Sequence, residues 1–110
     1  MIGKTLGKIE ARIQNGHHLS DKDKTDLLRL LKVLRSEITE FSKTRREEAE
    51  SIAGFFERST HEAARRTKNP ELLKVSIDGL AASVKGFEAS HPTLVESVND
   101  ICTVLAYMGI

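Results

Sequence analysis

The chain has 110 residues, enough for one modest hydrophobic core, and 39% of them are hydrophobic, 30% charged and 5% aromatic. The formal net charge of +1 excludes a strong global field that would draw the protein to nucleic acid or to a membrane surface. With no Trp and only two Pro, the composition is typical of a soluble all-helical protein, so we expect a single helical domain over residues 1–110.

The first half of the chain carries apolar residues at helical spacing. A short helix that ends near Gly16 is predicted by apolar residues separated by 4, 3 and 4 positions: Ile2, Leu6, Ile9 and Ile13. Ser20 then begins a second helix, because its hydroxyl can accept a hydrogen bond from a first-turn N–H. The charged stretch of residues 42–48 contains no helix breaker, although the apolar stripe shifts by one position across it. We therefore expect one long helix over about residues 20–67, with two helices joined near residues 42–48 as the alternative.

Two prolines mark the starts of two further helices. Both Asn69-Pro70 and Ser90-His91-Pro92 place a cap residue before a proline that would lie in the first turn. Apolar residues then recur at spacings of 4, 3, 4 and 3 within residues 73–87 and again within residues 94–108. We interpret the second proline segment as a corner between helices. A role for His91 in ligand binding or proton transfer is the alternative.

The same spacing in every segment determines the expected fold class. A repeat of 4 and 3 is typical of helices that pack side by side at a shallow angle. We therefore predict an all-α protein: an elongated helical bundle of four or five helices with coiled-coil-like packing. A long helix with a polar middle would leave apolar stripes that one chain does not cover, so we expect a homo-oligomer, with a dimer favoured. Binding to a different, unidentified protein partner is left open as a further hypothesis.

The C-terminal segment FEASHPTLVESVNDICTVLAYMGI carries two recognisable elements, FExSHPxL and the ending Met108-Gly109-Ile110. With these elements it resembles a family of small bacterial helical proteins catalogued as domain of unknown function 4404. The resemblance covers the last forty or so residues, and more loosely the helix that begins at Ser20. It implies a compact, cytoplasmic, all-helical protein, and it brings no activity, cofactor or catalytic residue.

Two histidine-containing segments are candidates for metal binding. The segment from His61 to Arg65 begins like the zinc-protease motif H-E-x-x-H, but Arg65 occupies the position of the second histidine ligand. The pair His17-His18 follows a glycine in the loop before Ser20, and we interpret it as a solvated turn. We therefore expect no metal site and no cofactor.

The single cysteine, Cys102, lies at the edge of an apolar stripe, where cysteine usually serves as a small core residue. Its sequence neighbours offer no base that would activate a thiol, and the chain contains no nucleotide-binding or hydrolase motif. We therefore expect no catalytic residue and no enzymatic activity; chemistry at Cys102 or His91 is the remaining alternative. One cysteine cannot form an intramolecular disulfide, and no apolar run reaches membrane-spanning length, which favours the cytoplasm and no membrane partner.

Two surfaces are predicted from residue type and spacing. A stripe of small residues, separated by 3, 4 and 3 positions, predicts a seam where a neighbouring helix approaches closely: Ser76, Gly79, Ser83 and Gly86. Glycine inside a helix costs about 1 kcal/mol relative to alanine, which favours packing over solvent exposure for this stripe. A basic surface is predicted from four arginines, Arg45, Arg46, Arg65 and Arg66, although glutamates interleaved with them favour an ordinary solvated face.

These observations lead to two functional hypotheses. The favoured one is a non-enzymatic, self-associating helical interaction module, because helical spacing continues through the chain without any catalytic cluster. The alternative is a small nucleic-acid-associated protein that uses the basic surface between Arg45 and Lys68, which the balanced charge does not favour.

Overall fold

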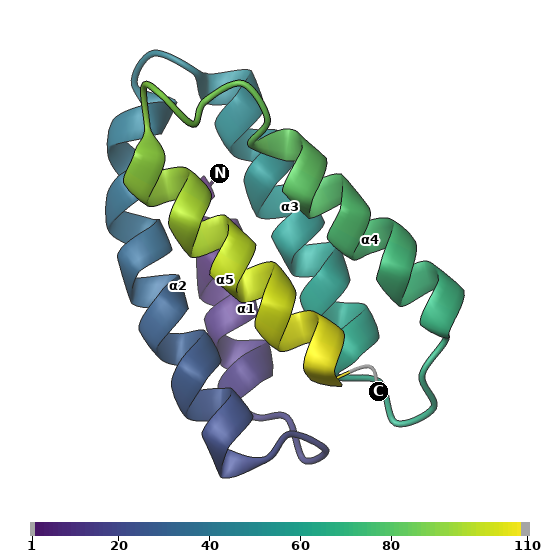
Figure 1. Cartoon of the computed structure of the whole chain (residues 1–110). Coiled ribbons are helices and arrows are strands. Elements are labelled where there is room, and N and C mark those ends of the chain that lie inside the picture. Colours follow the sequence, from purple (N-terminus) through teal and green to yellow (C-terminus); the bar gives the residue numbers. More distant parts are fainter. Residues whose placement is uncertain (1, 109–110) are drawn as a thin grey trace.

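The computed structural model describes residues 2–108, and this range contains five α-helices and no strand (Figure 1). The helices are α1 (Ile2–Gln14), α2 (Asp21–Ser42), α3 (Arg46–Ala63), α4 (Pro70–Ser83) and α5 (Pro92–Met108). The predicted all-α class is confirmed. The Met108-Gly109-Ile110 ending of the family resemblance falls mostly outside the described residues, because only Met108 belongs to them.

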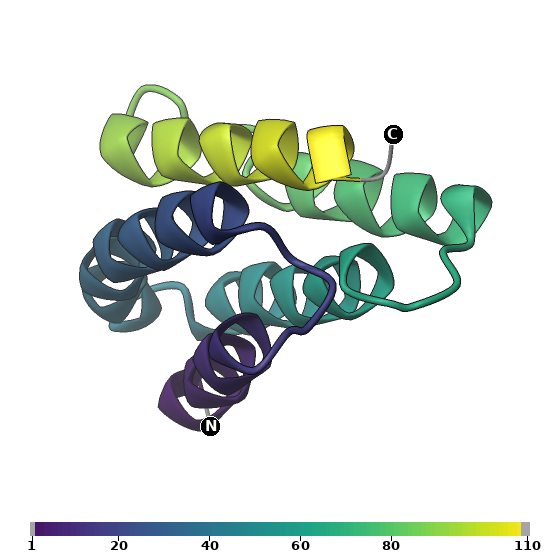
Figure 2. The ribbon, with the colours of Figure 1, turned by 90° about the horizontal axis from the view of Figure 1, so that it is seen from below.

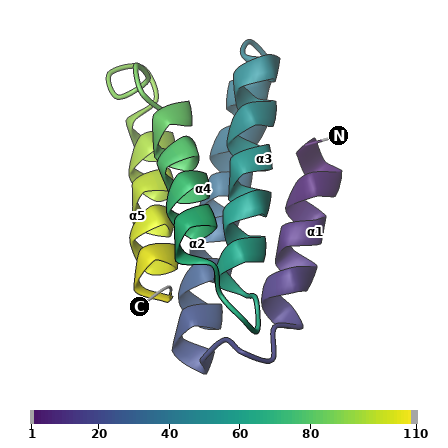
Figure 3. The same ribbon diagram turned by 90° about the vertical axis from the view of Figure 1, so that its right-hand side faces the viewer.

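The helices form three layers, with consecutive helices running in opposite directions (Figure 1). Helices α2 and α3 occupy the middle, α1 covers one of their faces, and α4 and α5 cover the other (Figures 2 and 3). The molecule measures 38 × 24 × 22 Å along its principal axes. Each helix therefore lies against at least two others, which allows one short chain to bury several apolar stripes at once.

The helix starts follow the capping residues predicted from the sequence. The Ser20 hydroxyl accepts a hydrogen bond from the Asp23 N–H at 3.1 Å, at the start of α2. The Asn69 side-chain oxygen accepts one from the Leu72 N–H at 3.1 Å, and Pro70 is the first residue of α4. Pro92 is likewise the first residue of α5. Both prolines therefore sit where a missing N–H costs no helical hydrogen bond.

The long helix predicted over residues 20–67 is wrong. Helix α2 ends at Ser42, Arg45 has a non-helical backbone (φ −134°, ψ 60°), and α3 begins at Arg46 and runs back along α2 (Figure 1). Residues 42–48 carry no large apolar side chain, so burial does not hold the helix straight there. The chain instead turns back there, so that the apolar stripe before this stretch and the apolar stripe after it are buried in one core. The longest dimension is therefore 38 Å, and not the roughly 70 Å of one continuous helix.

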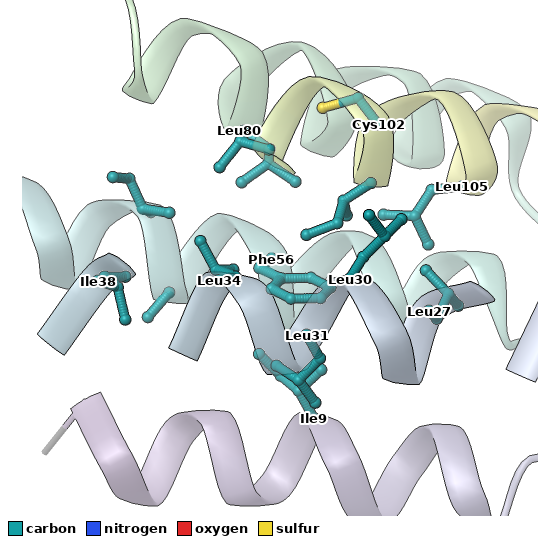
Figure 4. Close-up of a cluster of buried hydrophobic side chains, with 14 of the residues drawn as sticks. Ile9, Leu27, Leu30, Leu31, Leu34, Ile38, Phe56, Leu80, Cys102 and Leu105 are labelled. Carbon is teal, nitrogen blue, oxygen red and sulfur yellow. The ribbon is translucent and has the colours of Figure 1, made fainter. Parts of the chain in front are cut away.

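One hydrophobic core receives side chains from all five helices. Figure 4 shows Ile9 of α1, leucines of α2, Phe56 of α3, Leu80 of α4 and Leu105 of α5 in a single cluster. Phe56, Ile9, Leu80 and Leu105 expose at most 1% of their surface. The stripes found in the sequence are thus covered within one chain. The predicted dimer loses the reason given for it, because those stripes are already buried within one chain.

Candidate functional site

An apolar surface lies exposed where α3 and α4 run side by side. Phe55 of α3 is 40% exposed, and Leu72 and Val75 of α4 are 48% and 66% exposed. The Phe55 ring lies directly against Gly79, so a Cβ atom at position 79 would clash with it. Phe55 is therefore continuous with the α4 residues. We call this surface, made of Phe55, Leu72, Val75 and Gly79, the α3–α4 face.

The α3–α4 face arises from a second apolar stripe on α4. Leu72, Val75 and Gly79 are separated by 3 and 4 positions, which aligns them along one side of the helix. This stripe lies beside the buried stripe that contains Leu73 and Leu80. The apolar part of α4 is thus wider than the part that packs against α3 and α5, a width that was not predicted from the sequence. The signal was present as a second 3–4 spacing next to the first.

Charged residues of both signs border the α3–α4 face. On α4, the Lys74 ammonium lies 2.7 Å from the Asp78 carboxylate, and both side chains are mostly exposed. On α3, Glu62 is only 3% exposed and lies 2.9 Å from Arg65 and 3.9 Å from Arg58. These five groups carry three positive and two negative charges, so the border has only a small net charge. The border therefore suits a partner that also carries paired charges, rather than a polyanion.

The predicted small-residue seam is divided between α4 and the turn after it. Ser76 is buried and donates its hydroxyl to the Leu72 and Leu73 carbonyls, and Gly79 admits the Phe55 ring. Ser83 is the last residue of α4. Gly86 was wrongly expected inside the helix: it lies in the turn with φ 95°, a left-handed conformation that glycine adopts without strain. The close approach therefore occurs at Gly79, and its partner is α3.

Substitution at two glycines should separate close packing from helix propensity. Apart from its chain neighbours and the nearby backbone of α3, no described residue lies within 4 Å of the point that a Cβ would occupy at Gly54, so Gly54→Ala is expected to raise the free energy of unfolding by about 1 kcal/mol. Gly79→Ala should lose that gain, because its methyl group displaces the Phe55 ring. Urea denaturation measures both. In a Phe55→Ala background the gain at position 79 should return, and equal gains at both glycines in the parent would contradict the packing account.

The four arginines of the predicted basic surface do not lie together. Arg45 and Arg46 stand at the start of α3, whereas Arg65 and Arg66 follow its last residue, Ala63. An 18-residue helix separates the two pairs by about 27 Å. Arg45 also lies 3.6 Å from Glu48 and 5.6 Å from the centre of the Phe87 ring. The expectation of one basic surface is therefore corrected: the arginines form two separate pairs. One arginine of each pair, Arg45 and Arg65, lies against a carboxylate.

His91 packs at the corner between α4 and α5, as the proline segment predicted. The His91 and Phe41 rings make a T-shaped contact, with ring centres 4.8 Å apart. Phe41 and Phe87 make the same kind of contact, with ring centres 4.9 Å apart. The His91 carbonyl accepts the Val95 N–H at 3.1 Å, which begins the hydrogen bonding of α5. The arrangement gives His91 a structural role at a helix start.

Cys102 lies in the core, 9% exposed, with its Sγ atom 3.9 Å from the Ile77 carbonyl oxygen. Burial, with a smaller effect of the Asp78 carboxylate, raises the pKa of the Cys102 thiol from 9.0 to about 11. The thiol is therefore protonated at neutral pH, and protonated thiols are poor nucleophiles. The alternative of catalysis at Cys102 loses support.

Cys102 should consequently resist thiol reagents in the folded protein. At pH 8 we expect a disulfide reagent to modify native protein much more slowly than protein in denaturant, because the buried thiol yields little thiolate. Because the folded pKa is raised, stability is unaffected below about pH 9 and falls as pH rises from about 9 towards about 11. Modification at equal rates with and without denaturant would contradict this.

Two further properties concern the described residues as a whole. No group of three or more His, Cys, Asp or Glu side chains within residues 2–108 is arranged to hold a metal ion. At the segment that resembles the zinc-protease motif, Glu62 binds Arg58 and Arg65. Among the helices of residues 2–108, none combines the length and the apolar character needed to cross a membrane.

A family model described as a domain of unknown function (DUF4404) matches residues 27–110, which include most of α2 and all of α3, α4 and α5. No curated protein and no solved structure matches the chain significantly.

Proposed function

The chain belongs to the DUF4404 family, a domain of unknown function, and we propose that it is a non-enzymatic helical interaction module that self-associates through the α3–α4 face. The observation that carries the proposal is the exposure of Phe55, Leu72 and Val75 side by side on adjacent helices. Contiguous apolar side chains at the surface, bordered by charged ones, are typical of protein-binding sites. The single buried thiol fits a reducing compartment, so we place the module in the cytoplasm.

The occupant we propose for the face is a second copy of this chain. Lys74 and Asp78 lie one turn apart on the same side of α4. If two α4 helices meet antiparallel through their exposed sides, about a two-fold axis at the height of residue 76 along the helix, Lys74 of each copy lies opposite Asp78 of the other. Such an interface is self-complementary, because each copy supplies both the cation and the carboxylate that the other copy needs. The apolar stripe beside these charges would then lie in the centre of the contact.

The number of exposed apolar residues limits the strength of this association. Three partly exposed side chains offer a small contact, and small interfaces between folded proteins are usually transient. We expect a dissociation constant on the order of micromolar or weaker. The direct test is sedimentation velocity of the unmodified protein over a dilution series. A shift from monomer to dimer with rising concentration supports the proposal, and a monomer at all concentrations into the millimolar range overturns it.

The alternative of nucleic-acid binding has less support from the structure than it had from the sequence. It relied on one basic surface from Arg45 to Lys68, whereas Arg45 and Arg46 stand at the opposite end of α3 from Arg65 and Arg66. Binding to the phosphate backbone requires several cations within one track. Retention of the protein on DNA or RNA at low salt, lost in an Arg65→Gln, Arg66→Gln variant, would restore this alternative.

A further inference from the structure

A basic hollow lies where the end of α1, the loop after it and the end of α3 meet. The hollow is open to solvent, measures about 520 Å³, and is lined by Lys8, Arg12, Asn15, His17, His18 and Ala64, among others. Among the described residues, none that lines the hollow is acidic. The pair His17-His18, interpreted from the sequence as a solvated turn, is therefore brought beside two permanent cations of α1.

The two cations of the hollow are not neutralised by carboxylates. Within residues 2–108, neither Lys8 nor Arg12 has a carboxylate oxygen within 4.0 Å. Arg12 donates to the Nδ1 atom of His61 at 3.0 Å, so that ring nitrogen acts as an acceptor. Glu57 lines adjoining hollows with Lys8 and with Arg12, but beyond that distance. The positive charge on both side chains is thus available to a ligand.

The backbone contributes a smaller, opposite charge. Helices α1 and α3 both end beside the hollow, and each helix C-terminus carries about half a negative elementary charge. Together these ends amount to about one negative charge, against two full positive charges from Lys8 and Arg12. The imidazoles of His17 and His18 and the amide of Asn15 add hydrogen-bond donors without negative charge. The balance in the hollow favours an anion.

We propose that the basic hollow binds a small ligand that carries two or more linked phosphate groups. Lys8 and Arg12 are four residues apart, so their side chains leave α1 on one face, about 6 Å apart at Cβ. That separation allows each cation to meet a different phosphate of a short chain. Arginine adds the planar pair of donors that phosphate oxygens accept. A hollow of this volume lies within the range of small-molecule sites.

A small ligand fits better than a nucleic-acid strand. The hollow lies at the end of the bundle where α1 and α3 finish, and Arg45 and Arg46 lie at the other end of α3. A strand would need a continuous row of cations and aromatic side chains for base stacking. The adjoining hollows along the α1–α3 groove contain Glu50 and Glu57, which would repel such a strand. The anion-binding surface is therefore confined to the hollow.

The test uses inorganic pyrophosphate and tripolyphosphate as probes, titrated into the full chain at physiological salt and followed by calorimetry. We expect saturable binding of one probe per chain, weakened at least tenfold by Lys8→Gln and by Arg12→Gln. Lys32→Gln, which removes an equal charge from α2, should leave binding unchanged, and thermal melting should show that all three variants stay folded. The proposal is overturned if the parent does not bind, if Lys32→Gln weakens binding equally, or if a single-stranded oligonucleotide binds more tightly than tripolyphosphate.

Discussion

Phe41→Ala is expected to lower the free energy of unfolding by about 3–5 kcal/mol, the usual cost of removing a fully buried aromatic ring. Phe41 is completely buried at the end of α2. Its ring makes T-shaped contacts with the rings of Phe87 and His91, with ring centres 4.9 and 4.8 Å apart, so it anchors the corner between α4 and α5 to the central layer. Small domains are stable by only about 5–15 kcal/mol, so the variant should be marginally folded.

Phe55→Ala is the matched control for this substitution. It removes the same ring from a residue that is 40% exposed, so we expect a cost well below that of Phe41→Ala. Denaturation in urea at neutral pH measures both variants against the parent. If the two substitutions cost the same, Phe41 does not hold the corner as the ring contacts indicate.

Val75→Glu is expected to weaken self-association at least about a hundredfold while leaving the monomer folded. The side chain is 66% exposed in the monomer, so a carboxylate there keeps its hydration. In a two-fold dimer, however, both copies would bring an unpaired charge into the contact, and each must lose water. Sedimentation velocity over a dilution series measures the loss. Tyr107→Glu, on a 71% exposed residue of α5, should leave association unchanged.

Charge exchange on α4 tests whether the occupant is a second copy in the antiparallel arrangement. Lys74→Asp alone would place carboxylates opposite one another at two related points of the dimer, and should weaken association about tenfold. The double variant Lys74→Asp, Asp78→Lys keeps the pair within the helix and restores opposite charges across the axis, so it should recover association. A double variant as weak as Lys74→Asp would argue against this register.

The helix starts and the buried stripes were predictable from the sequence, because both depend on local chemistry. Ser20 and Asn69 cap their helices through their own side chains. Proline is favoured in the first turn of a helix, so Pro70 and Pro92 indicate where α4 and α5 begin. The break between α2 and α3 was not predictable in the same way. Residues 43–45 contain neither glycine nor proline, and the turn forms because folding back buries two stripes together. That gain comes from tertiary packing.

The candidate surfaces were harder to predict, because each depends on residues distant in the chain. Gly79 was recognised as a site of close approach, but its contact with Phe55 exists only once α3 and α4 are paired. Periodicity identifies an apolar stripe without saying whether a helix covers it, so exposure of Val75 was not foreseen. In the same way, Lys8 and His17 share a hollow only after the loop beyond α1 has folded against the end of α3.

The measurement that tests the central claim most directly is disulfide crosslinking of a Val75→Cys variant under mild oxidation. Two copies that meet through antiparallel α4 helices would bring position 75 of each close to the axis, within the reach of a disulfide. Cys102 is buried and should not react. We predict a covalent dimer in high yield for Val75→Cys and little for Tyr107→Cys, an equally accessible position on α5. Equal and low yields for both variants would contradict association through the α3–α4 face.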